Sequence, residues 1–439
     1  MTLPRHELPP AVFDEVAAGG GGPVALAMLR RAELSRRLVL LRAIVDAAER
    51  SGPGPGARAR QAYDVLAAVH RRSQAAARKV LTHPSVGPRC VDLLRTLAGG
   101  RRPADLDRLL EIAAAAAVHA GRPAQITLSV RDERIVLPSL GVAAFPGAPA
   151  GAPAVLDVGP DGATLAACGR VVSIPSDPYV EAGDWSGLRR VATLARGAPL
   201  LLDDVDPFRF TAGDRPCLPR LDAAEFAAWS EVVGGGWRLL RAFHRGPASE
   251  VAAGIRALVP IDPPDSHAVS ASSPETFGCV ALSLPRGPRA LAETFAHEIQ
   301  HNKLSPLLQL YELTRGRPDE LFYAPWRDDP RPLEGLFHGA YAYLGVARFW
   351  NRQRRAERDP DSQAHVLFAR WRDAALDTAQ VLLDGERITP LGRRFVTGML
   401  AALEALGREG VSREALAGAA RLSADHRRRW RDRNEPARP

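Results

Sequence analysis

The pentapeptide His297-Glu298-Ile299-Gln300-His301 constrains this chain more than any other feature of its sequence. Two histidines four residues apart lie one above the other on a single face of a helix, so both imidazoles can reach one metal ion. Glu298 points close to the same face, where a carboxylate can act as a base or orient a metal-bound group. The first expectation is therefore a helix that carries a metal ion, and a pair of surface histidines is the structural alternative.

The residues around the pentapeptide predict a buried helix with a strand before it. Apolar side chains recur at helical spacing between 289 and 314, which favours a helix packed on several faces: Leu291, Phe295, Ile299, Leu304, Leu307 and Leu308. Phe277–Leu284 is typical of a strand, and Pro285–Pro288 of the turn into the helix. We expect this strand to take up a peptide by edge addition. Pro306 lacks an N–H, so the helix is expected to kink there or to restart with Ser305 as its cap.

The composition of the chain limits the classes of partner that we expect it to bind. The chain has 439 residues, which allows a substantial core, and a formal net charge of +8. Lys79 and Lys303 are the only lysines; arginine, alanine, glycine and proline are abundant, as is typical of a GC-rich bacterial genome. The basic residues are spread along the chain without a nucleic-acid-binding module, so we expect no nucleic-acid partner.

The cysteines and the apolar stretches indicate a cytoplasmic protein. The four cysteines lack metal-binding spacing, which argues against an iron–sulfur cluster, a zinc ribbon or a disulfide framework: Cys90, Cys168, Cys217 and Cys279. The N-terminal residues do not resemble a signal peptide, and no stretch approaches the roughly 18 uninterrupted apolar residues of a membrane span. The sequence therefore predicts a soluble protein without a membrane partner.

Hydrophobic patterning divides the chain into three predicted regions: an N-terminal helical region at 1–121, a β-rich middle region at 122–220, and a helical metal-binding catalytic region at 221–439. Short β-rich runs separated by Gly, Pro and Asp predict a largely antiparallel sheet in the middle region. The predicted fold class is α+β and predominantly helical, with a zincin-like HExxH helix, a preceding strand and a small antiparallel sheet region.

Two loops are predicted to have no binding role. Gly19–Gly22 follows no strand and lacks the GK[ST] of a phosphate loop, so it is interpreted as a flexible connector. The acids of Leu202-Leu-Asp-Asp-Val-Asp-Pro do not have the spacing of a calcium loop, so they are interpreted as a solvated turn.

A metal ion needs a third protein ligand, and the segment 323–343 offers two. The sequence predicts a helix from Leu333, on which Glu334 and His338 are four residues apart and share a face. Glu334 matches the zinc peptidases that take a glutamate from a following helix, whereas His338 gives three imidazoles. These ligand types suit zinc and ferrous iron alike, so the metal stays open. A capping or core histidine is the structural alternative for His338.

Two stretches carry a resemblance to a known family. LAETFAHEIQHNKLSPLLQL at 291–310 and YAPWRDDPRPLEGLFHGAYAYLGVARFW at 323–350 resemble the bacterial HExxH family of peptide-modifying proteins, which is also found fused behind radical SAM domains in ribosomal-peptide gene clusters. The resemblance is strongest over 266–355. This chain lacks the radical SAM cysteines of the fused members, so only the hydroxylase part carries over.

The resemblance implies a peptide β-hydroxylase that depends on iron(II) and 2-oxoglutarate. It implies that His297, His301 and His338 bind ferrous iron, and that the substrate is a residue in a ribosomally made precursor peptide. Oxidative decarboxylation of 2-oxoglutarate to succinate and CO2 would accompany the hydroxylation. In this scheme Glu298 orients a ligand or the oxidant and is not a base.

The resemblance also implies a cation for the carboxylate of 2-oxoglutarate. Arg331 and Arg327, in the WRDDPR turn, are the two candidates. Their alternative role is a salt bridge with Asp328 or Asp329.

Two other functions stay open. In a zinc metallopeptidase Glu298 would be the general base, Glu334 or His338 the third ligand, and Tyr341 or Tyr343 an oxyanion donor. A catalytically silent peptide-binding protein would have no metal or a structural one.

Overall fold

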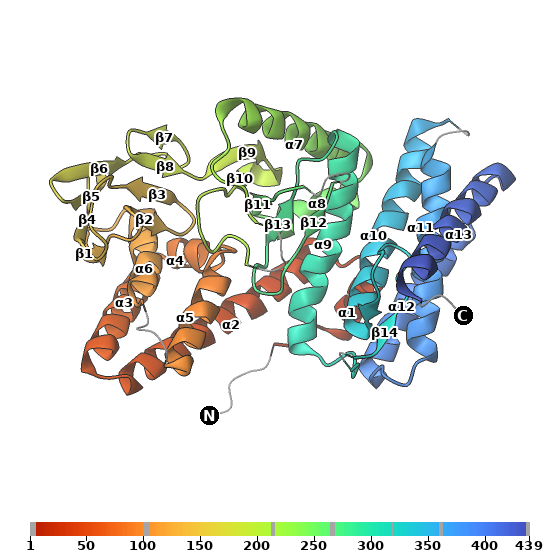
Figure 1. Ribbon diagram of the computed structural model, residues 1–439, viewed down its shortest axis with the longest axis horizontal. Coiled ribbons are helices and arrows are strands. Elements are labelled where there is room, and N and C mark those ends of the chain that lie inside the picture. Colours follow the sequence, from red (N-terminus) through yellow and green to blue (C-terminus); the bar gives the residue numbers. More distant parts are fainter. Residues whose placement is uncertain are drawn as a thin grey trace. The chain divides into compact units, whose positions relative to one another are not determined.

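The protein has an α+β fold in which 57% of the chain is helical, so the predicted fold class is confirmed. The computed structural model describes residues 6–100, 105–211, 216–263, 268–317, 319–359 and 363–435. The contacts divide the chain into two units (Figure 1): unit 1 contains Met1–Leu29, Val232–Ile255 and Pro285–Pro439, and unit 2 contains Arg30–Glu231 and Arg256–Leu284. Each unit thus combines segments of different predicted regions.

Unit 1 is built from helices and one two-stranded ribbon. Its elements are α1 (Pro10–Ala17), the start of α2 (Gly22–Arg50), the end of α7 (Ala223–Phe243), α8 (Arg245–Gly254), α9 (Pro288–Leu310), β14 (Leu321–Phe322), β15 (Arg331–Pro332), α10 (Leu333–Glu357), α11 (Gln363–Asp384), α12 (Pro390–Gly407) and α13 (Arg413–Asn434). The predicted metal-binding helix is α9, which runs without interruption through Pro306.

Helices α9 and α10 pack closely because α10 carries a glycine at the contact. A Cβ atom added to Gly345 would lie 2.5 Å from the carbonyl oxygen of Ala296 and 2.7 Å from Cγ of Gln300. Such distances are shorter than any van der Waals contact, so only glycine allows this approach. The apolar core of unit 1 lies between α1, α9, α10, α11 and α12 and includes Phe13, Leu304, Phe337, Tyr341 and Phe395.

The loop at Gly19–Gly22 is held by many hydrogen bonds, so its interpretation as a flexible connector was wrong. The ammonium of Lys303 is fully buried and donates to the carbonyls of Gly19 (3.1 Å) and Gly20 (2.9 Å) and to Glu250 (2.9 Å). The other carboxylate oxygen of Glu250 accepts from the backbone N–H of Gly22 at 3.0 Å. A buried cation needs such partners, and here backbone carbonyls supply two of them.

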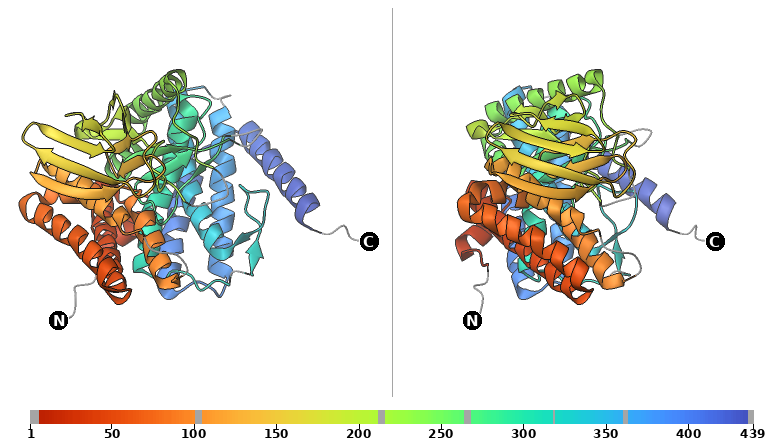
Figure 2. Two further views of the ribbon diagram at one scale, coloured as in Figure 1. Left: turned by 60° about the vertical axis from the view of Figure 1, so that its left-hand side comes forward. Right: turned by 90° about the vertical axis from the view of Figure 1, so that its left-hand side faces the viewer.

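Unit 2 combines helices with three sheets. The helices are the rest of α2, α3 (Pro53–Arg72), α4 (Gln74–Leu81), α5 (Val86–Gly99), α6 (Asp107–Ala120) and the start of α7, with a short 3-10 turn at Ala195–Gly197. One sheet has the order β1-β4-β5-β6 and is antiparallel, from β1 (Ala124–Ser129), β4 (Pro153–Gly159), β5 (Gly162–Ala167) and β6 (Arg170–Ile174). Figure 2 shows the strands in yellow over the helices in orange.

The other two sheets of unit 2 are smaller or mixed. An antiparallel sheet has the order β2-β3-β8-β7, from β2 (Arg134–Leu137), β3 (Gly141–Ala144), β8 (Trp185–Gly187) and β7 (Glu181–Ala182). A mixed sheet has the order β12-β13-β11-β10-β9, from β12 (Ser270–Ala271), β13 (Cys279–Leu282), β11 (Ala257–Pro260), β10 (Pro199–Leu202) and β9 (Arg189–Thr193). The antiparallel pairings predicted for the middle region are confirmed.

The strand predicted before the metal-binding helix exists, but it cannot add a peptide at its edge. This strand is β13, and it pairs with β11 on one side and with β12 on the other. All four of its residues are buried. Because both edges of its backbone are already paired, the expectation of edge addition at this strand was wrong.

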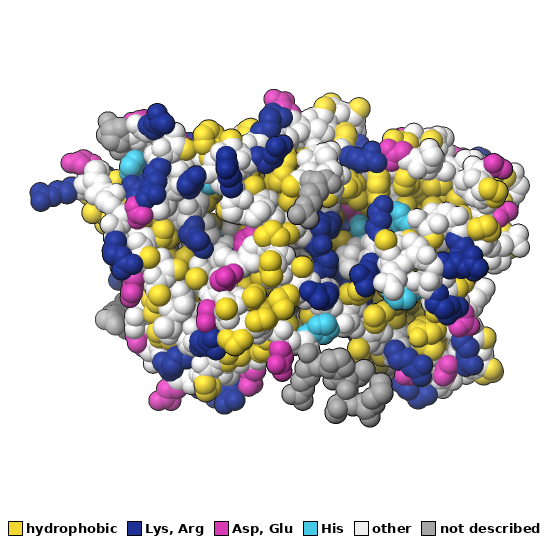
Figure 3. Space-filling view, turned by 180° about the vertical axis from the view of Figure 1, so that it is seen from behind, with side chains coloured by type: hydrophobic (Ala, Val, Ile, Leu, Met, Phe, Trp, Pro, Cys, Tyr) yellow, Lys and Arg dark blue, Asp and Glu magenta, His cyan; other side chains and the backbone are white. Residues whose placement is uncertain are grey.

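Basic side chains are scattered over the surface, as the sequence suggests. Figure 3 shows one face, on which Lys and Arg side chains in dark blue alternate with acidic and hydrophobic ones. Among the described helices, none is by itself long and apolar enough to cross a bilayer; the bent pair α1 and α2 reaches that length and composition only jointly.

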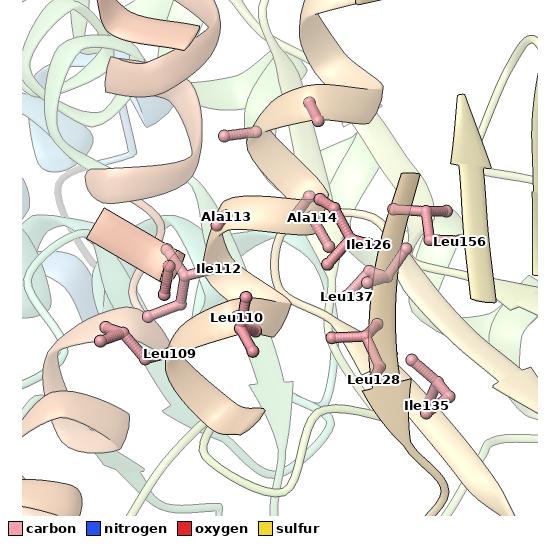
Figure 4. Packing of buried hydrophobic residues seen from close by; sticks show 14 of the residues in the cluster. Leu109, Leu110, Ile112, Ala113, Ala114, Ile126, Leu128, Ile135, Leu137 and Leu156 are labelled. Atoms are coloured by element: carbon pink, nitrogen blue, oxygen red, sulfur yellow. The ribbon is translucent and has the colours of Figure 1, made fainter. Parts of the chain in front are cut away.

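The main core of unit 2 lies between α6 and the sheets. In Figure 4 Leu109, Leu110 and Ile112 of α6 point toward apolar residues from neighbouring elements, and Ile126, Leu128, Ile135, Leu137 and Leu156 come from β1, β2 and β4. All of these side chains are buried. The run of five alanines at 113–117 is fully buried as well, and its small side chains allow α6 to pack closely.

The three acids after β10 are buried, so their interpretation as a solvated turn was wrong. Asp204 forms ion pairs with Arg189 and with Arg220 (2.6 Å), and Asp206 pairs with Arg89 at 3.1 Å. Arg89 lies 117 residues before Asp206 in the chain, and no local pattern reveals such a pairing. Arg89 is itself 1% exposed and also pairs with the buried Glu111.

We predict that replacing Gly345 by alanine separates α9 from α10 and lowers the free energy of unfolding. Overpacking of a dense contact typically costs about 1–3 kcal/mol. Gly407→Ala at the end of α12 is the matched control, because nothing lies within 4 Å of the position its Cβ would take. Urea unfolding of both variants measures the difference, and equal midpoints would contradict the packing argument.

We predict that Arg89→Met destabilises the protein strongly, because it leaves Glu111 and Asp206 buried without their shared cation. Breaking a buried ion pair by removing one partner costs about 3–5 kcal/mol. Arg190→Met removes an exposed pair with Asp177 and serves as control, with an expected loss of at most about 1 kcal/mol. Chemical denaturation of both variants measures the loss in free energy of unfolding. Similar losses for the two variants would show that the buried ion pairs stabilise the protein no more than the exposed one.

Candidate metal centre

Helix α9 brings the two histidines of the pentapeptide together as predicted. The Nε2 atoms of His297 and His301 are 3.1 Å apart. Two imidazole nitrogens bound to one metal ion at about 2.0–2.1 Å lie roughly 3 Å apart, so this pair has the separation that a shared ion needs. The side chain of His297 is 22% exposed, which leaves the pair accessible from solvent.

The third imidazole comes from α10. His338 Nδ1 lies 3.3 Å from His301 Nδ1, so His301 contacts His297 with one ring nitrogen and His338 with the other. As placed, the three nitrogens do not converge on a single point, and no group of three His, Cys, Asp or Glu side chains in the described residues is arranged to hold a metal ion. Glu334, the alternative third ligand, lies exposed in the first turn of α10.

Burial keeps the three imidazoles neutral near pH 7. Burial, together with the neighbouring His297, lowers the pKa of His301 to about 4. It lowers the pKa of His338 to about 3, with added effects from His301 and Arg331. Burial also lowers the pKa of His297, although Glu298 opposes this shift. A neutral imidazole has one free lone pair, which is the form that binds metals.

Glu298 is buried beside the first histidine. One of its carboxylate oxygens is 3.9 Å from His297 Nε2, and the residue is 1% exposed. A second acid, Glu293, precedes His297 by four residues and accepts a hydrogen bond from the indole N–H of Trp350 at 2.8 Å. Burial raises the pKa of Glu293. The site thus contains acidic groups next to neutral imidazoles.

Aromatic side chains form a wall beside His297. The ring of Tyr343 lies edge-to-face with that of His297, with centroids 5.2 Å apart. Trp326 stacks on Tyr343 at 4.7 Å, and Trp371 of α11 lies on it at 4.5 Å. Gly339 of α10 makes room for the indole of Trp326, which any side chain there would meet. The wall shields one side of the histidine pair from water.

Tyr343 and not Tyr341 stands beside the histidines. The hydroxyl of Tyr341 is buried and donates to the carbonyl of Val16 at 2.6 Å, so this side chain anchors α1. Burial and Glu293 raise the pKa of Tyr343, whereas Arg370 lowers it. Of the two tyrosines considered as oxyanion donors, only Tyr343 contacts a histidine of the cluster.

The two arginines predicted to bind 2-oxoglutarate both pair with Asp329. Arg327 Nε donates to Asp329 at 2.8 Å, and Arg331 Nη1 does so at 3.3 Å. Arg331 also lies close enough to His338 to lower its pKa, and its guanidinium covers Gly335 of α10. Arg331 therefore borders the cluster, while sharing its carboxylate partner with Arg327.

Sequence reasoning missed Arg370 of α11. Its guanidinium lies over the ring of Trp371 at 4.3 Å, it is half-buried, and it makes no ion pair with any described residue. Burial lowers its pKa, since a cation is costly there without an anionic partner. No motif marks Arg370, because it reaches the site from a third helix; the tryptophan that follows it is the only hint in the sequence.

The donor set fits a divalent transition-metal ion at the His297–His301 pair. Imidazole suits zinc and iron alike, and the nearby carboxylate of Glu298 can support either. No protein-family model and no curated protein matches this chain. The evidence for a metal centre is therefore the chemistry and spacing of these side chains.

We predict that the purified chain binds a divalent metal ion and that His301→Ala loses it. The expected loss of affinity exceeds the about 10–100-fold that removal of an outer-sphere partner costs. His338→Ala should lose the ion as well and Glu334→Gln should keep it, because His338 contacts His301 whereas Glu334 is exposed. Elemental analysis after dialysis measures the content, with the exposed His70→Ala as control. Retention of the metal by His301→Ala would contradict the assignment.

Proposed function

We propose that this chain is an iron(II)- and 2-oxoglutarate-dependent hydroxylase that acts on the β-carbon of a residue in a ribosomally made precursor peptide. The observation that carries the proposal is the cluster of three imidazoles from α9 and α10. His297, His301 and His338 would hold the iron. When bound, it supplies the activation of dioxygen that is coupled to decarboxylation of 2-oxoglutarate.

The side chains around the cluster support binding of an anionic cosubstrate. Arg370 is a half-buried cation without an ion-pair partner among the described residues, and it lies beside Tyr343, which contacts His297. It is a better cation for a carboxylate than Arg327, whose charge Asp329 neutralises. Arg331 stays a candidate, because it borders His338. The carboxylate of 2-oxoglutarate would displace no existing ion pair at Arg370.

The aromatic wall and Glu298 have supporting roles in this proposal. Trp326, Tyr343 and Trp371 exclude water from one side of the histidines, which protects an oxidation from side reactions. Glu298 lies next to His297 Nε2 and orients that ring or a bound ligand.

A zinc metallopeptidase is the second candidate function, and the position of Glu298 favours it specifically. The carboxylate lies 3.9 Å from Nε2 of His297, the nitrogen that faces His301, and a peptidase places its general base beside the metal-binding nitrogen. The same motif in a catalytically silent peptide-binding protein would serve neither reaction.

We predict that the anaerobically purified protein, given iron(II), 2-oxoglutarate, oxygen and the precursor peptide encoded beside its gene, yields a peptide heavier by one oxygen together with succinate. Mass spectrometry separates the outcomes. Peptide fragments formed with zinc would establish the peptidase instead, and an unchanged but bound peptide would indicate the silent protein. His297→Ala should abolish the reaction, whereas His70→Ala should not.

Two variants sharpen this test. If Glu298 orients a ligand, we expect Glu298→Gln to lower the rate by about tenfold or less; a general base contributes about 10²–10⁴-fold. Arg370→Gln should raise the KM for 2-oxoglutarate with little change in kcat, because it removes a binding group. If Arg370→Gln leaves the KM for 2-oxoglutarate unchanged, the carboxylate of 2-oxoglutarate is assigned to Arg331. The variant Arg331→Gln then tests that assignment.

A further inference from the structure

A cavity in unit 1 lies against a face of α9 that is turned away from the histidine cluster. It has a volume of 310 Å³, the lower end of the range for small-molecule sites. Ala296 and Gln300 of α9 line it, and each precedes a histidine of the metal centre by one residue, so these side chains point about 100° away from the histidines around the helix. Neither His297 nor His301 lines this cavity. Its chemistry is therefore separate from that of the histidine cluster.

Three arginines give the cavity a positive charge. Arg245 begins α8, and Arg348 and Arg352 extend from α10. Arg348 donates to the carbonyl of Ala18 at 2.8 Å and Arg352 to that of Phe243 at 2.9 Å. None of the three makes an ion pair with a described residue. The acid of the cavity, Glu250, is already bound to Lys303 and to the backbone of α2, so it does not neutralise them.

The cavity wall also contains two buried hydrogen-bond acceptors without partners. Gln300 is 4% exposed; its Nε2 donates to the carbonyl of Gly19, and its Oε1 has no partner. His244 is 2% exposed; its Nε2 lies 2.9 Å from Oε1 of Gln353, whose amide is oriented by a bond from its Nε2 to Glu357. His244 must therefore donate through Nε2, which leaves Nδ1 as an acceptor that also lacks a partner.

The combination defines the ligand by its chemistry. Unpaired arginines and the N-terminus of α8, a helix of ten residues, favour carboxylates. Unsatisfied buried acceptors cost free energy until a donor reaches them, so the ligand needs N–H groups. We infer that this cavity binds an acidic amino-acid unit, with its carboxylates on Arg348, Arg352 and Arg245 and its N–H groups toward Gln300 and His244. The unit can be a free acidic amino acid or an acidic residue within a peptide.

Calorimetric titration of the full-length protein tests the inference without metal or peptide substrate, so its outcome is independent of the proposed hydroxylation. The probes are L-glutamate, an acetylated and amidated tetraglutamate, glutarate and L-lysine. We expect saturable binding of glutamate or of the tetraglutamate. The probe that binds more tightly shows whether the ligand is a free acidic amino acid or an acidic residue within a peptide. Glutarate has the two carboxylates without the N–H groups and should bind at least about tenfold more weakly than glutamate. L-lysine should not bind.

Two variants locate the binding. Arg348→Gln and Arg352→Gln should each weaken it by about tenfold or more, and Arg241→Gln, an exposed arginine of α7 outside the cavity, should not. Thermal unfolding by circular dichroism confirms that the variants are folded. Absence of binding of both acidic probes at about 10 mM, or equal binding by the variants and the control, would overturn the inference. Equal affinities for glutamate and glutarate would overturn the roles of Gln300 and His244.

Discussion

The close packing of α9 on α10 is the contact on which the histidine cluster depends. Gly345 lets the backbone of α10 approach Ala296, which directly precedes His297. His338 lies seven residues before Gly345, almost two helical turns along the same helix, so this approach also brings its ring to His301. Because Gly345 has no side chain, the two helices come close enough for imidazoles of different helices to contact each other.

Helix α9 has a different chemistry on each of its buried faces. On one face, burial keeps the imidazoles uncharged and available as ligands. On another, Lys303 stays charged because Glu250 and two carbonyls of the N-terminal loop surround its ammonium. Burial by itself disfavours the charged form of any side chain. A buried side chain therefore keeps its charge only where ion-pair or hydrogen-bond partners surround it. The same rule explains Asp204 and Asp206, each of which forms an ion pair with an arginine.

Local patterns predicted α9, β13 and the start of α10 closely, because apolar spacing is read over short distances. Caps are equally local: the side chain of Ser412 caps α13, and that of Thr389 caps α12. Helices α3 and α4 are separate, since the side chain of Ser73 caps a new helix. Strands β5 and β6 form a hairpin, in which Cys168 and Gly169 take positive φ angles and turn the chain.

The sequence by itself determined that His297 and His301 share a helical face, because four residues complete about one turn. It also indicated that α9 is buried and that His338 and Glu334 compete for the third position. Only the tertiary structure shows which of the two lies near the pair: His338 is 3.3 Å from His301, whereas Glu334 is exposed. Contacts between separate helices likewise create the aromatic wall, the position of Arg370 and the cavity beside Gln300. A pattern along one segment carries no information about such contacts.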